Sequence, residues 1–207
     1  MRILKIIIFL FTAVAIGQNV QLTNAEQALF VKDVTNKANS LKTLSSDFTQ
    51  TKHIQLMENK AVSKGKLYYK APNILKWEYS SPYDYKIIFR DNQLHINDDG
   101  DKSVTSLRSN KLMEKLIGLI SGSVNGKLVN DHENFDVSFS KDGKFVTALI
   151  VPKDSSVKQM FHEIIMVFDN ENILYSVRLM EDGGDYTHIE FKNIRINTPL
   201  DPSVFEN

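Results

Sequence analysis

The sequence predicts a mainly β fold of the α+β class, in which one antiparallel sheet carries two helices. Alternating apolar and polar residues, the pattern of half-buried strands, recur every ten or so residues after residue 45. Turn signals such as Pro72-Asn73 and Asp91-Asn92 separate these runs, and such short spacing favours hairpins over crossover helices. Apolar residues at helical spacing mark two further segments, about 24–42 and 109–121.

The chain begins with the features of an export signal, which we expect to span residues 1–17. Arg2 and Lys5 precede an apolar run over 6–16, and small residues end it. The run is too short for a transmembrane helix, which needs about 20 residues. A buried N-terminal strand is the alternative, but the flanking residues favour cleavage, export to the periplasm and one domain over 18–207.

The composition argues against several classes of function. The chain contains no cysteine, so it has no disulfide framework and lacks the acylated cysteine that anchors bacterial lipoproteins. Its 25 basic residues balance 25 acidic residues, and the mature chain is near −2 because Arg2 and Lys5 leave with the signal. This balance argues against a nucleic-acid partner and against a strongly electrostatic membrane binder. We expect an unanchored monomer.

Both predicted helices carry an apolar face. Thr23 and Glu26 have the spacing of a capping box at the start of the first helix. Ser109 can cap the second helix and Gly122 can end it, and its apolar surface is too large to lie free in water. The apolar residues that recur at helical spacing are Leu29, Phe30, Val34, Ala38, Leu41 and Leu44 along and just beyond the first helix, and Leu112, Met113, Leu116, Ile117, Leu119 and Ile120 in the second.

Residue patterns for catalysis or metal binding are missing. The five histidines occur singly, without the partners that a zinc site needs, and the sequence has neither a Gly-x-Ser-x-Gly elbow nor a phosphate-binding glycine loop. The acidic run Asp98-Asp99-Gly100-Asp101 lacks EF-hand spacing and fits a solvated hairpin tip. The sequence therefore predicts no enzyme activity, no metal and no cofactor.

The strands predict either an apolar pocket or a plain core. A single sheet with both faces partly apolar needs two covers, or one cover and a ligand. Aromatic and methionine side chains suit a pocket for flexible chains, but such stripes form plain core more often, so periodicity leaves both interpretations open. The candidate lining residues are Leu75, Trp77, Tyr79, Ile88, Leu112, Met113, Leu116, Ile117, Ile120 and Met166.

Several short motifs follow one another at defined distances. Phe48-Thr49-Gln50 precedes Gly65-Lys66-Leu67, a Pro-x-x-x-x-Trp pattern lies within 70–78, and the chain closes with 199–205, Pro-Leu-Asp-Pro-Ser-Val-Phe. Each motif is weak alone, but their order and spacing are specific together. In this order they resemble the LolA family of outer-membrane lipoprotein carriers over essentially the whole mature chain.

The resemblance implies a fold and a role. The fold is an incomplete antiparallel β-barrel (half-barrel) with a helical lid over an apolar concavity. The role is that of a periplasmic chaperone, which takes acylated lipoprotein cargo from an inner-membrane ABC lipoprotein exporter and delivers it to an outer-membrane acceptor. By position, Leu75 and Trp77 match the family's pocket lining, and Leu112, Met113, Leu116 and Ile117 match its lid.

The sequence departs from the family at three positions. Members often have an arginine before the proline, which ties the closed lid, whereas this chain has Ala71 next to Lys70. The family's Asp-Gly turn is Asp91-Asn92, and His95 replaces a common aromatic residue. The resemblance thus leaves open how the lid is held and whether the cargo is the same.

Three other classes of protein fit parts of the sequence. A periplasmic lipid-binding or envelope-sensing domain of the same fold is the main alternative, although such domains usually belong to longer, membrane-anchored proteins. An outer-membrane receptor of this architecture would need the acylated cysteine that the sequence lacks. An unrelated secreted hydrolase would need an arranged nucleophile, which the motifs do not supply.

Overall fold

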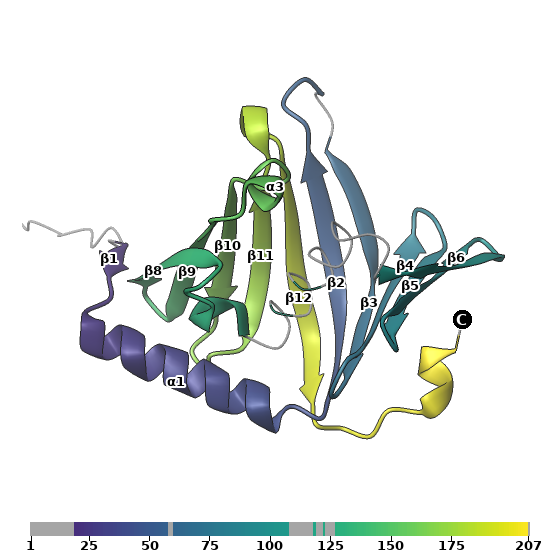
Figure 1. Ribbon diagram of the computed structural model, residues 1–207, viewed down its shortest axis with the longest axis horizontal. Coiled ribbons are helices and arrows are strands. Elements are labelled where there is room, and N and C mark those ends of the chain that lie inside the picture. Colours follow the sequence, from purple (N-terminus) through teal and green to yellow (C-terminus); the bar gives the residue numbers. More distant parts are fainter. Residues whose placement is uncertain (1–18, 58–59, 108–117, 119–121, 123–126, 207) are drawn as a thin grey trace, which may run out of the picture.

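The computed structural model describes residues 19–57, 60–107, 118, 122 and 127–206 (Figure 1). Within them, a 12-stranded antiparallel sheet has the order β1-β8-β9-β10-β11-β12-β2-β3-β4-β5-β6-β7. β1 and β7 stand at opposite ends of this order, so the sheet is open rather than closed, as expected for a half-barrel. The strands are β1 (Val20–Gln21), β2 (Thr43–His53), β3 (Ala61–Lys70), β4 (Ile74–Ser81), β5 (Tyr85–Arg90), β6 (Gln93–Asp98), β7 (Asp101–Ser106), β8 (Phe135–Asp142), β9 (Phe145–Pro152), β10 (Glu163–Phe168), β11 (Leu174–Met180) and β12 (Tyr186–Ile196).

Two meanders build the sheet. Strands β2 to β7 follow one another in space, as do β8 to β12, which confirms the predicted hairpin connections. At the Asp91-Asn92 turn both residues have positive φ, 50° and 60°, as a two-residue type I′ hairpin turn requires. The pairing of β12 with β2 joins the two meanders, so strands far apart in sequence share one surface.

One side of the sheet, which we call the inner face, is apolar across both meanders. Directly opposed residues of an antiparallel sheet point to the same side, so the register identifies the members of each face. Opposed pairs on the inner face include Met166 and Val177, Phe191 and Phe48, and Leu67 and Trp77. The side chains between them lie on the other side, the outer face.

Helix α1 (Asn24–Ser40) begins with the predicted capping box. The Thr23 hydroxyl accepts a hydrogen bond from the Glu26 backbone N–H, and the Glu26 carboxylate accepts one from the Thr23 backbone N–H at 2.9 Å. The other carboxylate oxygen of Glu26 pairs with Lys141 of β8. The same side chain therefore starts the helix and ties it to the sheet.

Helix α1 covers part of the inner face. Phe30 packs edge-on against Phe139 of β8 and Phe168 of β10, with ring centroids 5.4 and 5.2 Å apart, and Val34 is buried one turn later. The expectation that Leu29 belongs to the packed face is wrong, because it is 60% exposed. Adjacent helix residues point about 100° apart, so Leu29 turns outward when Phe30 faces the sheet.

The remaining described segments are short. The helices are η2 (Lys127–Asn130), α3 (Ser155–Lys158), η3 (Asp182–Gly184) and η4 (Pro202–Phe205). Arg90 Nη1 donates a hydrogen bond to the Phe205 carbonyl oxygen at 3.4 Å, so η4 lies against the β2–β7 meander of the sheet (Figure 1). None of the helices in the described part of the chain is both long and apolar enough to span a membrane.

Two predictions fall on other parts of the chain. The expected signal peptide, 1–17, lies outside the described residues. The expected second helix, 109–121, also lies outside them, except for Gly118.

Candidate functional site

Aromatic side chains gather on the inner face around β2 and β4. Phe48 of β2 packs on Trp77 of β4 with ring centroids 4.3 Å apart, and it meets Tyr79 edge-on at 5.3 Å. Trp77 also lies 6.4 Å from Phe191 of β12. Phe48 and Trp77 are 2% and 8% exposed. These four residues form what we call the aromatic cluster.

Gly65 of β3 makes the cluster possible. It lies between Phe48 and Tyr79 in the register, so the Phe48 ring must cross over it to reach β4. A Cβ at Gly65 would lie 2.6 Å from Phe48 Cζ and 2.0 Å from the Glu78 carbonyl oxygen, far inside contact distance. A glycine in a strand commonly marks such a close approach, and here it lets two aromatic rings meet across an intervening strand.

Two polar groups interrupt this apolar surface. The Tyr79 hydroxyl donates a hydrogen bond to Gln50 Oε1 at 3.1 Å. Burial, and to a smaller extent the Tyr83 phenol, raise the pKa of Tyr79, while the nearby Trp77 indole and Gln50 lower it in part, so the phenol stays neutral. The Trp77 Nε1–H is buried and has no acceptor in hydrogen-bond geometry among the described residues. The described part of the inner face therefore presents an apolar surface in which the Trp77 donor lies beside the Tyr79 phenol without a well-aligned acceptor.

A cavity of about 150 Å³ opens between the end of α1 and the inner face. Leu67 and Phe191 line it, and both also adjoin Trp77, so the cavity and the aromatic cluster belong to one continuous surface. Its lining is mostly apolar, with polar side chains at a few positions, and its volume suits a small apolar group. The lining residues are Val34, Lys37, Ala38, Ser40, Leu41, Leu44, Ser46, Leu67, Phe168, Asn172, Ile173, Leu174, Phe191, Ile194 and Ile196.

Asn197 holds the helix against the strands that line the cavity. Its side-chain oxygen accepts a hydrogen bond from the Lys42 backbone N–H at 2.7 Å, and its side-chain nitrogen donates one to the Ser40 carbonyl at 3.1 Å. It adopts φ of 57°, a conformation that asparagine tolerates better than most residues. The end of α1 is thereby fixed to the end of β12.

The structure brings together three of the predicted site residues and separates two others. Leu75, Trp77 and Tyr79 follow one another on the inner face of β4. Ile88 does not join them: it opposes Lys76 on the outer face, because Ile87 is the residue opposite Trp77. Met166 lies on the inner face of β10, and β11, β12, β2 and β3 separate it from β4.

Met166 therefore belongs to another part of the same surface. Five strand spacings place it roughly 24 Å from Trp77 along the sheet. It is fully buried, and Phe168, two residues along β10, packs against Phe30 of α1. The predicted lid residues Leu112, Met113, Leu116, Ile117 and Ile120 lie outside the described residues and stay predictions.

Sequence reasoning missed several residues of this surface. Phe48, Phe168 and Phe191 come from three strands that are distant in the sequence. Their alternation marks each as a buried strand residue, but the pairing of β12 with β2 decides that Phe48 and Phe191 share the surface of Trp77. The helical residues Val34 and Ala38 carried a signal, because they lie on the predicted apolar face of the first helix.

Ala71 and His95, two positions where the sequence departs from the family, lie on opposite faces of the sheet. The Ala71 side chain packs against the core of the inner face, and its backbone N–H donates to the Lys42 carbonyl at 2.8 Å. His95 lies on the outer face beside Arg90, whose Nε donates to His95 Nε2 at 3.4 Å. Burial, and then the Arg90 charge, lower the pKa of His95, which favours the neutral imidazole.

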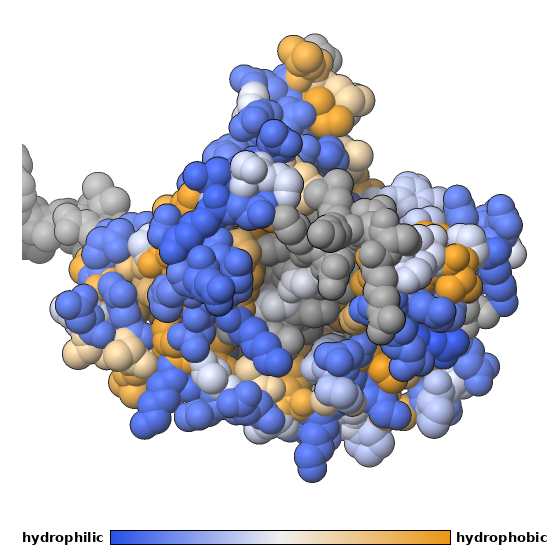
Figure 2. Space-filling model, in the orientation of Figure 1, coloured by the Kyte–Doolittle hydropathy of each residue, from blue (hydrophilic) through white to orange (hydrophobic). Residues whose placement is uncertain are grey.

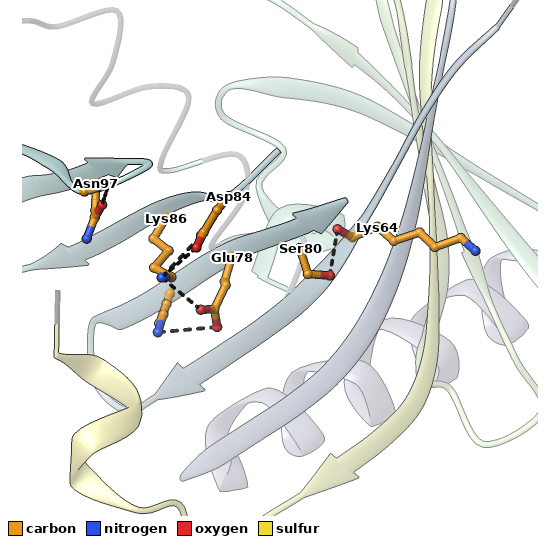
Figure 3. Close-up of polar contacts among 8 residues, drawn as sticks. Lys64, Glu78, Ser80, Asp84, Lys86 and Asn97 are labelled. Atoms are coloured by element: carbon orange, nitrogen blue, oxygen red, sulfur yellow. Dashed lines mark hydrogen bonds and ion pairs between the residues drawn. The ribbon is translucent and has the colours of Figure 1, made fainter. Parts of the chain in front are cut away.

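The outer face of β4 and β5 carries a group of charged side chains (Figure 3). Glu78 lies 3.4 Å from Lys76 and 3.8 Å from Lys86, and Lys86 also pairs with Asp84 at 3.2 Å. The outer face of these strands is therefore largely charged, with Ile88 as a buried apolar member, whereas the inner face is apolar. Within the described part of the chain, no group of three or more acidic or histidine residues is placed to hold a metal ion.

Comparison with known proteins gives this surface its context. Residues 39–207 match the family model described as outer membrane lipoprotein carrier protein LolA. The chain belongs to the LolA family. Its relatives include the outer-membrane lipoprotein carrier protein of Chromobacterium violaceum, 28% identical over 201 residues that cover 95% of this chain and 90% of the relative. The protein of the same name from Methylococcus capsulatus is 25% identical over 168 residues, 81% of this chain and 77% of the relative.

A solved structure shares the fold. The chain aligns with a chain of the Pseudomonas aeruginosa MucA/MucB complex at a TM-score of 0.52 and 7% identity. The alignment covers 87% of this chain and 60% of that one. At this identity the likeness concerns the fold alone.

Proposed function

We propose that this LolA-family chain is a periplasmic, non-enzymatic chaperone that binds the acyl chains of lipoproteins and carries them from the inner to the outer membrane. The observation that carries the proposal is the apolar inner face, where the aromatic cluster and the cavity form one continuous surface. Family membership and the names of the relatives support a lipoprotein carrier. An inner-membrane ABC exporter is the proposed donor, and an outer-membrane acceptor receives the cargo.

The size of the cavity sets a condition on the mechanism. A volume of about 150 Å³ is the space that holds one benzene-sized ligand, about six carbon atoms. Three long acyl chains do not fit in this cavity alone, so more of the inner face must take part when cargo binds. A cover that packs on the inner face when the protein is empty satisfies this condition, and we assign that role to the segment 109–121.

The energies explain why such a cover is useful. Each methylene removed from water contributes about 0.8 kcal/mol, so three exposed chains would bind any apolar surface strongly. A carrier must also release its cargo. A cover that competes with the cargo for the same surface offsets part of that free energy, because opening it exposes its own apolar residues.

The described residues suggest how one chain is held. Leu75, Trp77 and Tyr79 supply apolar contact, and Met166 extends the surface towards β10. The Trp77 Nε1–H lies near the Tyr79 phenol but has no described acceptor in good hydrogen-bond geometry, so it suits an ester or amide carbonyl at the head of an acyl chain. Ile88 is not part of this proposal, because it lies buried on the outer face, on the other side of the sheet from Trp77.

The test uses a triacylated lipoprotein and the same protein without its acyl chains. The chain is incubated with inner-membrane vesicles that contain the exporter and the labelled lipoprotein, and soluble complexes are collected. We expect acylated cargo in the soluble fraction and no retention of the unacylated form. Release of both forms alike, or of neither, contradicts the proposal.

A pair of surface variants sharpens the test. Ile196 lines the cavity and is 38% exposed, so Ile196→Glu places a charge at its mouth without emptying the core. Val104→Glu makes the same kind of change on the outer face of β7, where Val104 is 56% exposed. We expect weaker cargo capture from Ile196→Glu alone.

A lipid-binding or envelope-sensing domain of the same fold is the alternative function. Native mass spectrometry of the chain purified from the periplasm separates the two. A bound lipoprotein supports the carrier, and bound phospholipid or fatty acid without lipoprotein supports the alternative.

A further inference from the structure

The β2–β3 hairpin projects beyond the rest of the sheet and ends in exposed apolar side chains (Figures 1 and 2). Leu56 is 98% exposed and Met57 is 55% exposed. We call these two residues the hairpin tip. Figure 2 shows hydrophobic colour at the end of this projection and along its right side, and hydrophilic colour along its left side.

The backbone that carries the tip is braced. The Met57 backbone N–H donates to the Ile54 carbonyl oxygen at 2.9 Å, which closes a turn around Leu56. The Gln55 backbone N–H donates to Asp185 Oδ1 at 2.8 Å, so the connection between β11 and β12 supports the turn from the side. The two apolar side chains are therefore presented outward from a supported position.

We infer that the hairpin tip is a membrane-contact site, which inserts into the surface of a phospholipid bilayer. A stable protein interface needs roughly 800 Å² from each partner, and two side chains on a convex tip supply only a small part of this. A bilayer requires no complementary shape and accepts a projecting apolar side chain. Since even one myristoyl chain binds membranes only weakly and reversibly, two side chains give a brief contact, which suits a protein that must leave again.

The charges below the tip favour an apolar contact over an electrostatic one. Lys52 pairs with Glu181 at 3.0 Å, so this lysine is neutralised. Lys60 is exposed on the same connection as the tip, and Asp182 and Asp185 lie on the neighbouring one, so the described residues around the tip carry no excess of basic charge. Binding should therefore depend little on anionic lipid or on salt, whereas a contact held by basic residues would weaken as salt screens it.

This inference goes beyond the proposed function and does not depend on acylated cargo. The empty protein should contact vesicles whether its inner face holds lipoprotein, phospholipid or nothing. If the carrier test fails, this inference still stands. If the vesicle test fails, the proposed carrier function still stands.

The first test is flotation of the exported chain with vesicles of phosphatidylethanolamine and phosphatidylglycerol. The double variant Leu56→Gln, Met57→Gln keeps the charge and approximate size of the tip. Its matched control is Leu29→Gln, a change of the same kind at a 60% exposed position on α1, away from the tip (Figure 1). All variants share one N-terminus, so they differ only at the substituted positions.

We expect the double variant to partition onto vesicles at least about tenfold less than the parent chain, since burying one leucine side chain is already worth that factor. Leu29→Gln should partition like the parent, and neither result should change when sodium chloride is raised. Equal flotation of the double variant and the control overturns the inference. Loss of binding in salt overturns it too, because the contact would then be electrostatic.

A second measurement locates the contact directly. The chain has no cysteine, so Leu56→Cys and Leu29→Cys each provide one site for an environment-sensitive fluorophore. A blue shift with vesicles at position 56, and none at position 29, is expected. If neither probe responds to protein-free vesicles, the tip does not enter lipid, and a protein partner becomes its explanation.

Discussion

Replacing Gly65 with alanine should damage the inner face through one added methyl group. The new Cβ would lie 2.0 Å from the Glu78 carbonyl oxygen and 2.6 Å from Phe48 Cζ. The ring can move by rotation, but the carbonyl belongs to the backbone of the paired strand β4. The substitution therefore has to push β3 and β4 apart where Phe48 packs on Trp77.

The expected loss of stability in Gly65→Ala follows from the clash between the new Cβ and the backbone of β4. Overpacking a core costs about 1–3 kcal/mol, and a clash with backbone belongs at the upper end. For a domain of this size each kcal/mol lowers the melting temperature by about 2–4 °C, so we expect a fall of roughly 6–12 °C. Trp77 is the single tryptophan of the chain, so its fluorescence reports unfolding at the site of the clash.

Two further variants separate the causes. Gly122→Ala is the matched control, because a Cβ there would lie 3.6 Å from Leu128 Cβ, an ordinary contact. Its melting temperature should stay the same or rise slightly. Shortening the ring with Phe48→Leu in the Gly65→Ala background should restore only part of the loss, because the clash with Glu78 remains. A Gly65→Ala protein as stable as its parent would refute the reasoning.

Two other predictions concern the cover and the helix. Hydrogen bonds from Lys141 and Thr23 hold the pKa of Glu26 at about 2, below its usual 4.5, so its stabilising contribution is complete above pH 4.5 and is lost as the pH falls towards 2. Urea unfolding between pH 6 and pH 2.5 should show this loss in the parent and a smaller one in Glu26→Gln; parallel curves would contradict it. Leu116→Glu should weaken capture of acylated lipoprotein while export to the periplasm continues, and unchanged capture would remove the segment 109–121 from the proposed cover.

Local signals predicted much of the fold. The capping box at Thr23, the hairpin turn at Asp91-Asn92 and the alternation of Leu75 with Trp77 each depend on a few neighbouring residues, and each occurs as expected. Local signals failed where neighbours were equally apolar. Ile87 and Ile88 are both apolar, and a change of one residue in register exchanges the two faces, so the sequence could not tell which one shares the side of Trp77.

The sequence alone determined the class of elements, the turns between them and the absence of cysteine chemistry, because propensity, capping and composition act over short distances along the chain. Only the tertiary structure decided which side chains form the candidate site. The pairing of β12 with β2 brings Phe191 to Trp77, and the docking of α1 leaves a cavity at their side. These contacts join residues more than a hundred positions apart, and they depend on strand register and helix phase, which no local pattern fixes.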